Sequence, residues 1–155
     1  MPKQRDLIKM SDDELAAFVQ SRKSMMVASL GKDGAPHQTV LWFAVKDGRY
    51  LFETYGASQK VVNLRRDPRI SLMWESGLDY NELRGVTVNG RAEIVDSEPR
   101  QSELMSVIIK RNNPAITDEA LAAHVERMKR KRVVVVVHPE KVVSWDHTKL
   151  AALAH

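Results

Sequence analysis

The sequence predicts a mainly β protein with flanking helices, an α+β fold built on a small closed barrel of six or seven antiparallel strands. Two dipeptides that favour tight hairpins, Asp33-Gly34 and Asp47-Gly48, separate strand-like segments early in the chain. Later segments rich in valine and isoleucine repeat the strand pattern. Strands and helices do not alternate regularly, which disfavours a parallel Rossmann-type sheet and leaves a β-sandwich as the alternative.

The composition fits a single domain over residues 1–155, with 43% hydrophobic and 28% charged residues. The chain has no cysteine, which excludes disulfides and thiol nucleophiles and is typical of a reducing cytoplasm. No apolar run reaches the roughly 18 residues of a membrane span, so we expect a cytoplasmic protein without a membrane partner. The net charge is +4, but stacking aromatics are not interleaved with the cations, so we expect no nucleic-acid partner.

The first third of the chain is predicted to form one helix and three strands. Ser11 followed by Glu14 is a capping-box pattern, which predicts a helix from about Asp12 to Ser21. The two hairpin turns then join three strands into an antiparallel meander. These strands are expected at Met25 to Leu30, Pro36 to Lys46 and Arg49 to Thr54.

The rest of the chain is expected to add further strands and helices. Ser58 caps a short helix that ends near Arg66, because Pro68 disfavours helical geometry at Asp67. Two longer helices are expected at Pro99 to Lys110 and Asp118 to Arg130. The other strands are expected at Arg69 to Glu75, Arg84 to Val95, Val133 to Val137 and Lys141 to Trp145, the last two separated by a turn at His138-Pro139.

Lys60 stands at the second position of the short helix, where a cation opposes the helix dipole at a cost of about 0.3–1 kcal/mol. The same helix start offers free N–H groups and the Ser58 hydroxyl, and Thr54 adds a second hydroxyl nearby. A cation, hydroxyls and free N–H groups at a helix N-terminus are typical of a phosphate site. The alternative interpretation is a solvent-exposed lysine on the first turn.

The segment from His37 to Trp42 alternates between two faces, as expected of a strand. One face carries His37, Thr39 and Leu41, and the other carries Gln38 and Trp42. Two interpretations are open: a strand that enters the core, or a wall for a flat aromatic ligand. In the second, Trp42 packs on the ring and His37 or Thr39 bonds to its edge.

Familiar catalytic motifs are missing from the sequence. It contains no GxGxxG, no Walker lysine loop, no HExxH and no GxSxG. The five histidines are scattered without metal-ligand spacing, so we expect no metal site. The catalytic residues are therefore unknown at this point.

Three segments, GKDGAPHQTVLWF, SQKVVNLRRDPRISL and RGVTVNGRAEIV, together carry a family resemblance. In this order they resemble the flavin and deazaflavin oxidoreductases related to pyridoxamine 5′-phosphate oxidase, and most closely the branch that uses the deazaflavin coenzyme F420. The resemblance implies a split β-barrel like that of FMN-binding proteins. It also implies a homodimer with two cofactor sites at the subunit interface.

The resemblance further implies which residues surround the cofactor. Lys60 matches a lysine that contacts the cofactor phosphate, and a residue near Trp74 to Tyr80 comes from the partner subunit. The implied cofactor-binding set is His37, Gln38, Thr39, Leu41, Trp42, Thr54, Ser58, Gln59, Lys60 and Trp74. Three side chains are candidates for a proton donor: His37, Tyr80 and His147. The C-terminal tryptophan and arginine pattern that binds pyridoxine in the oxidase is missing.

The resemblance leads to three functional hypotheses. The first is an oxidoreductase that uses F420 for hydride transfer to a small organic substrate. The second is an FMN-dependent enzyme on the same fold, and the third is a protein that binds a flavin or F420 without turnover. In the two enzymatic cases the hydride chemistry resides in the cofactor, which agrees with the missing catalytic motifs.

Overall fold

The computed structural model describes residues 1–153, and one seven-stranded antiparallel sheet dominates it. The strands are β1 (Ser24–Leu30), β2 (Pro36–Trp42), β3 (Ala44–Lys46), β4 (Arg49–Tyr55), β5 (Arg69–Ser76), β6 (Arg84–Val95) and β7 (Arg132–Asp146). The helices are α1 (Gln4–Leu7), α2 (Asp12–Ser21), α3 (Gln59–Arg66), α4 (Arg100–Asn112), α5 (Asp118–Met128) and α6 (Thr148–Leu153), with a 3₁₀ turn, η1, at Tyr80–Glu82. None of these helices is long and apolar enough to cross a membrane.

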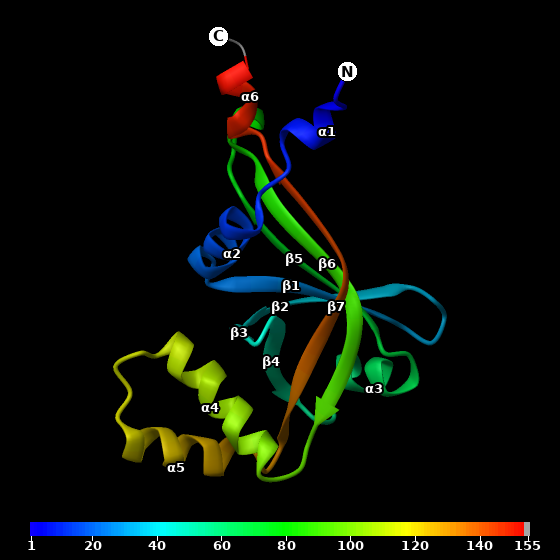
Figure 1. Ribbon diagram of the computed structural model, residues 1–155. Helices are drawn as coiled ribbons and strands as arrows, with labels where there is room; N and C mark the ends of the chain where they lie inside the picture. Colours follow the sequence, from blue (N-terminus) through cyan, green and yellow to red (C-terminus); the bar gives the residue numbers. More distant parts are fainter. Residues whose placement is uncertain (154–155) are drawn as a thin grey trace.

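The sheet curls round, so that its two edge strands, β2 and β3, follow one another in the chain with a single residue between them. The strand order is β2-β1-β5-β6-β7-β4-β3, and Phe43 alone separates β2 from β3 in the chain. The prediction of one strand from Pro36 to Lys46 is therefore wrong, because β2 pairs with β1 whereas β3 pairs with β4. The break lets Phe43 turn into the core, where its ring lies 5.3 Å from that of Trp74. This curled sheet confirms the predicted split barrel (Figure 1).

Strand β7 corrects a second prediction. The expected turn at His138-Pro139 is absent: one strand runs from Arg132 to Asp146, and it pairs with β6 from Val134 to Asp146. A register shift between Asn89 and Gly90 absorbs the irregularity opposite Pro139. A Cβ at Gly90 would lie 2.2 Å from the carbonyl oxygen of His138, so the two backbones approach closely there.

The other predicted elements agree with the structure to within about two residues, whereas α1, η1 and α6 were not predicted. The capping box of α2 is present, with Ser11 and Glu14 each bonded to the other's backbone. Asp47 and Gly48 both have positive φ angles, as a two-residue hairpin requires. Helix α3 ends before Asp67, as Pro68 predicts.

Two apolar clusters lie on opposite faces of β4 and β7. The first fills the interior of the curled sheet and includes Phe52, Val135 and Val137. The second lies beneath the hairpin of α4 and α5 and includes Val134 and Val136. Alternate residues of β7 thus contribute to different clusters. Figure 1 shows the α4–α5 hairpin and α3 at separate places around the barrel.

Candidate cofactor-binding site

Lys60 is buried at the start of α3, not exposed to solvent. Its residue is 9% exposed, and its Nζ donates a hydrogen bond to Thr54 Oγ1 over 3.2 Å. Helix α3 is amphipathic and buries Val61 and Leu64, so its first turn packs against the sheet. The interpretation of Lys60 as a solvent-exposed lysine is therefore wrong.

The ammonium group of Lys60 is in an unfavourable electrostatic position. Burial lowers the pKa of Lys60, and the charge of Glu53 opposes this shift only in part. An ammonium has three N–H donors, and the neutral Thr54 hydroxyl offers no counter-charge. A bound anion at this place would supply that charge and accept further hydrogen bonds.

Ser58 occupies the N-cap position of α3, as predicted, but its side chain does not cap the helix. Its Oγ is buried and lacks a hydrogen-bond partner among the described residues. A buried hydroxyl without a partner costs free energy, and such groups in native structures call for an explanation. A ligand oxygen at the helix N-terminus would satisfy both this hydroxyl and the free N–H groups.

A chain of hydrogen bonds connects α3 to β1 beside Lys60. Gln59 Nε2 donates to Asn63 Oδ1 over 2.8 Å, and Asn63 Nδ2 donates to Ser29 Oγ over 3.1 Å. Ser29 is paired with His37 across β1 and β2. The side chains of directly opposed residues share a face of the sheet, which places His37 next to this chain.

Two more buried polar atoms of β2 lack partners among the described residues: His37 Nδ1 and Thr39 Oγ1. Both residues belong to the inward face of β2, together with Leu41, which packs against the interior cluster. Unsatisfied polar atoms beside an apolar cluster favour a wall for a polar ligand edge over a plain core strand.

The structure divides the predicted set into three groups. Thr54, Ser58, Gln59 and Lys60 surround the start of α3, and His37, Thr39 and Leu41 lie on the inward face of β2. Gln38 and Trp42 are exposed on the opposite face of β2. Trp74 is 1% exposed and lies in the core, with its ring centroid 4.9 Å from that of Tyr50. The structure thus gives Trp74 a core position and not one at a surface.

Two residues of this chain of hydrogen bonds, Ser29 and Asn63, were not predicted as site residues from the sequence. Ser29 follows Met25 and Val27 on the buried face of β1, so a polar residue interrupts an apolar stripe. That interruption is a signal the sequence contained. Asn63 is fully buried and joins Ser29 to Gln59 through its side-chain amide.

Two of the proton-donor candidates lie together, away from α3. The rings of Tyr80 and His147 are 4.6 Å apart, and His147 Nδ1 donates to the Tyr80 carbonyl over 2.7 Å. His147 directly precedes α6, which Figure 1 shows at the opposite end of the long strands from α3. Within one chain, His37 is the member of the three that lies beside the α3 site.

Comparisons with known proteins bear on the family and the fold of the chain. A family model described as "Pyridoxamine 5′-phosphate oxidase" matches residues 11–146. A curated pyridoxine/pyridoxamine 5′-phosphate oxidase of Kineococcus radiotolerans is 35% identical over 83 residues, which are 54% of this chain and 36% of that protein. The chain thus spans little more than a third of that relative's length.

Solved structures give the same result at the level of the fold. The conserved hypothetical protein Rv2991 of Mycobacterium tuberculosis superposes with a TM-score of 0.89 at 43% identity, covering 97% of this chain and 93% of its own. A structure described as an F420 reductase has a TM-score of 0.62 at 20% identity, with 92% and 98% covered. At that identity the second likeness concerns the fold alone.

Proposed function

This chain belongs to the pyridoxamine 5′-phosphate oxidase family of flavin-binding oxidoreductases, and we propose that it uses coenzyme F420 for hydride transfer to a small organic substrate. The observation that carries the proposal is the buried ammonium of Lys60 beside the unpartnered Ser58 hydroxyl. Together they fit a phosphate group at the start of α3. The missing catalytic motifs support a reaction in which the cofactor supplies the chemistry.

The residues around α3 take defined roles in this proposal. Lys60, Ser58 and Thr54 hold the cofactor phosphate, and the deazaflavin ring supplies the hydride when bound. His37 Nδ1 and Thr39 Oγ1, both buried and without a partner in residues 1–153, bond to polar atoms of the cofactor. The protein's task is to bind, orient and exclude water, because these steps hold the reacting atoms in place.

A phosphate site accepts FMN as well as F420, so FMN is the alternative cofactor. The choice of F420 follows the resemblance of the three sequence segments to the branch that uses this coenzyme. A protein that binds either cofactor without turnover is the third option. These options differ in colour, fluorescence and turnover, which makes them separable by experiment.

We also propose that two chains form a homodimer through the outer face of the sheet. One row of paired residues crosses five strands there: Val40, Met26, Met73, Thr87 and Val143. Val40 is exposed and the other four are half-buried, which leaves a mostly apolar strip on one face. Sedimentation analysis should give a dimer, and Met73→Glu should shift it to monomer.

A binding screen tests the cofactor proposal. The protein is purified from a host that lacks F420 and titrated with F420, while the cofactor's fluorescence is followed. We expect micromolar or tighter binding to a colourless protein. Lys60→Ala should weaken it at least tenfold, since a hydrogen bond to a charged group contributes about 1.5–3 kcal/mol. Lys46→Ala, an exposed lysine at the end of β3, is the matched control.

Each other outcome has a definite meaning. A yellow protein that retains FMN would replace F420 by FMN in the proposal. If the protein binds neither F420 nor FMN, both the F420-dependent and the FMN-dependent enzyme hypotheses are overturned. Bound reduced F420 that no conjugated enone or nitroaromatic acceptor reoxidises would favour storage over catalysis.

A further inference from the structure

A cavity of about 370 Å³ lies between α2 and one end of the long strands β6 and β7. Helix α2 lines it with Ala17 and Phe18, and Arg22 follows directly after the helix. The strands contribute Arg84, the first residue of β6, and Asp146, the last residue of β7. The size of the cavity is that of a small-molecule site.

Arg84 is the central member of a short row of polar residues across three strands. It stands directly opposite Ser76 of β5 on one side and Asp146 of β7 on the other. Directly opposed residues share a face of the sheet. The guanidinium of Arg84 lies 5.3 Å from the centroid of the Phe18 ring, which belongs to the interior cluster. The row therefore lies on the interior face, beneath α2.

Arg84 is half-buried and has no acceptor within residues 1–153, although an acid stands opposite it. The Oδ1 atom of Asp146 instead accepts hydrogen bonds from the N–H and the hydroxyl of Thr148, over 3.0 and 2.6 Å, at the start of α6. Ser76 Oγ is also buried and without a partner in the described chain. Two neighbouring donors of the row are therefore unsatisfied, and buried polar groups of this kind call for an explanation.

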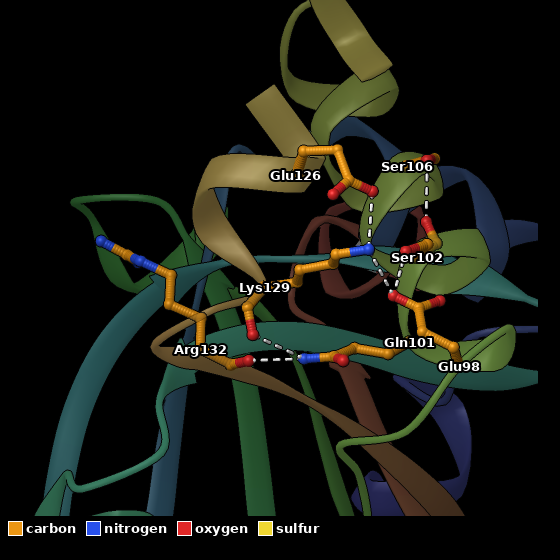
Figure 2. Close-up of polar contacts among 7 residues, drawn as sticks. All are labelled: Glu98, Gln101, Ser102, Ser106, Glu126, Lys129 and Arg132. Carbon is orange, nitrogen blue, oxygen red and sulfur yellow. Dashed lines mark hydrogen bonds and ion pairs between the residues drawn. The ribbon is translucent and has the colours of Figure 1, made fainter. Parts of the chain in front are cut away.

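Other half-buried cations of the described chain have acceptors. Figure 2 shows Lys129 between two carboxylates, with its Nζ 3.0 Å from Glu98 and 2.6 Å from Glu126. Arg132 forms an ion pair with Glu53 over 2.9 Å. These pairs satisfy the cations where they are partly removed from water.

Arg111 is a closer comparison, because its guanidinium also lies over a phenylalanine ring. It is 4.0 Å from the centroid of the Phe43 ring. It donates to the carbonyls of Gln20, Arg22 and Phe43 over 3.2, 2.9 and 3.2 Å. Arg84 has the ring contact without the acceptors, so its donors are free for a ligand.

The charges around the cavity favour a ligand with a single negative charge. Glu14, which also lines the cavity, forms an ion pair with Lys149 over 2.6 Å. The remaining charges are those of Arg22 and Arg84 against Asp146, an excess of one cation. A divalent anion would be repelled by Asp146 without a second cation to balance it, whereas a monoanion is balanced.

Helix α2 is held over the strands by contacts at both of its ends. Before the helix, the N–H of Met10 donates to Ser144 Oγ of β7 over 3.0 Å. After the helix, Arg22 NH1 donates to the Glu75 carbonyl of β5 over 3.3 Å. The cavity is therefore preformed, and a ligand would not have to order its walls.

We propose that this cavity binds a small monocarboxylate with an apolar body. The two carboxylate oxygens accept hydrogen bonds from the guanidinium of Arg84, whose planar fork matches their geometry. Arg22 adds positive charge, and the Ser76 hydroxyl is the neighbouring donor. The apolar body of the ligand packs against Ala17 and Phe18.

The proposed carboxylate site is distinct from the α3 site. Arg65 of α3 forms an ion pair with Asp96, which directly follows the last residue of β6. Arg84 is the first residue of the same strand. The two sites thus lie near opposite ends of β6, and Figure 1 shows α2 and α3 on different sides of the barrel.

Benzoate is the probe, and benzamide, which is neutral and of nearly the same shape, is the matched control. Cofactor-free protein is titrated with each at neutral pH and low salt by calorimetry, and the Nε–H signals of ¹⁵N-labelled arginines are followed in parallel. We expect the Arg84 signal, assigned with Arg84→Met, to shift with benzoate. Benzoate should bind at least tenfold more tightly than benzamide, the value of a hydrogen bond to a charged group. Inorganic phosphate should bind more weakly than benzoate.

Arg84→Met removes the guanidinium and keeps an unbranched side chain over Phe18. It should reduce the affinity for benzoate at least tenfold, to that for benzamide. Arg91→Met is the matched control, because this arginine lies on the same strand and pairs with Glu140. It should leave the affinity for benzoate unchanged.

Two alanines of α2 provide a second pair of variants that leaves the arginines in place. Both Ala16 and Ala17 are exposed, but only Ala17 lines the cavity. Ala17→Trp should fill the cavity and abolish benzoate binding, whereas Ala16→Trp should not change it. Because both substitutions are at exposed positions, this pair tests the site even if Arg84→Met does not fold.

Several outcomes would overturn the proposal. They are the absence of benzoate binding, equal affinities for benzoate and benzamide, and tighter binding of phosphate than of benzoate. Benzoate binding that Arg84→Met or Ala17→Trp leaves unchanged would also overturn it. So would benzoate binding that Lys60→Ala abolishes, since this would place the anion at α3. Arg84→Met should leave F420 binding unchanged, so the two proposals fail separately.

Discussion

Lys60 Nζ donates to Thr54 Oγ1 over 3.2 Å and thereby joins the first turn of α3 to the end of β4. The bond pairs a charged donor with a neutral acceptor in a buried place at the positive end of a helix. Each of these conditions disfavours the charge while no anion is present. The position therefore favours ligand binding at the expense of the stability of the free protein.

Lys60→Met is expected to keep or raise the stability of the cofactor-free protein, by up to about 1 kcal/mol at neutral pH, because it replaces a buried charge by an apolar side chain. The gain should shrink toward pH 10.5, since the folded-state pKa of Lys60 is lowered and stability rises with pH where the unfolded chain still binds the proton. Urea unfolding at pH 7 and 10 measures both effects. A large loss of stability would show that Lys60 is structural; Lys46→Met is the control.

Glu93 is expected to make the fold sensitive to acid. Arg100, followed by His138, lowers the pKa of Glu93 from 4.5 to about 2. Its stabilisation is thus present above pH 4.5 and lost as the pH falls toward 2. Because the carboxylate is 40% exposed, we expect Glu93→Gln to cost only about 0.5–1 kcal/mol at pH 7 and nothing near pH 2. Urea unfolding at the two pH values measures this difference.

Glu140→Gln is the control for Glu93. Its ion pair with Arg91 is longer, at 3.5 Å, and both side chains are 59% exposed. We expect a change below about 0.5 kcal/mol at either pH. A Glu93→Gln penalty that persists at pH 2 would assign the effect to packing and not to charge.

Gln101→Met should destabilise the α4–α5 hairpin by about 1–3 kcal/mol, because the carbonyls of Lys129 and Arg132 lose their amide donor. Chemical denaturation followed by circular dichroism measures the loss. Ser106→Ala is the control, since its hydroxyl bonds only within α4, to the Ser102 carbonyl. An unchanged Gln101→Met protein would mean that water replaces the amide.

Arg111→Lys should lower the free energy of unfolding by about 2 kcal/mol, although it keeps the positive charge. A lysine has no planar fork to reach three carbonyls and stack on Phe43 at once. Arg91→Lys, whose ion pair is exposed, should change stability by less than about 0.5 kcal/mol. Equal effects in thermal unfolding would show that charge alone accounts for the role of Arg111.

Most of the fold was predictable because local rules determine it. The capping box at Ser11, the hairpin at Asp47-Gly48 and the helix end before Pro68 depend on neighbouring residues only. The two errors in the strands are of a different kind. The break at Phe43 and the continuity of β7 past Pro139 arise from pairing with distant strands, which no local pattern contains.

The candidate site was predictable to a similar degree. The conflict between Lys60 and the helix dipole was visible in the sequence, and so were the nearby hydroxyls. The burial of Lys60 was not visible, because it depends on how α3 packs on the sheet. The core position of Trp74 was missed for the same reason. The alternation of residues along a strand shows on which face a side chain lies, but it does not show what packs against that face.

The alternation of valines along β7 has a consequence for cooperativity. Val135 and Val137 belong to the interior cluster, whereas Val134 and Val136 belong to the cluster beneath α4 and α5. Neither cluster is complete unless this one strand is in place. The hairpin of α4 and α5 is therefore not a separable folding unit, and its slowest amide hydrogens should exchange with solvent at the same rate as those of the barrel, through global unfolding.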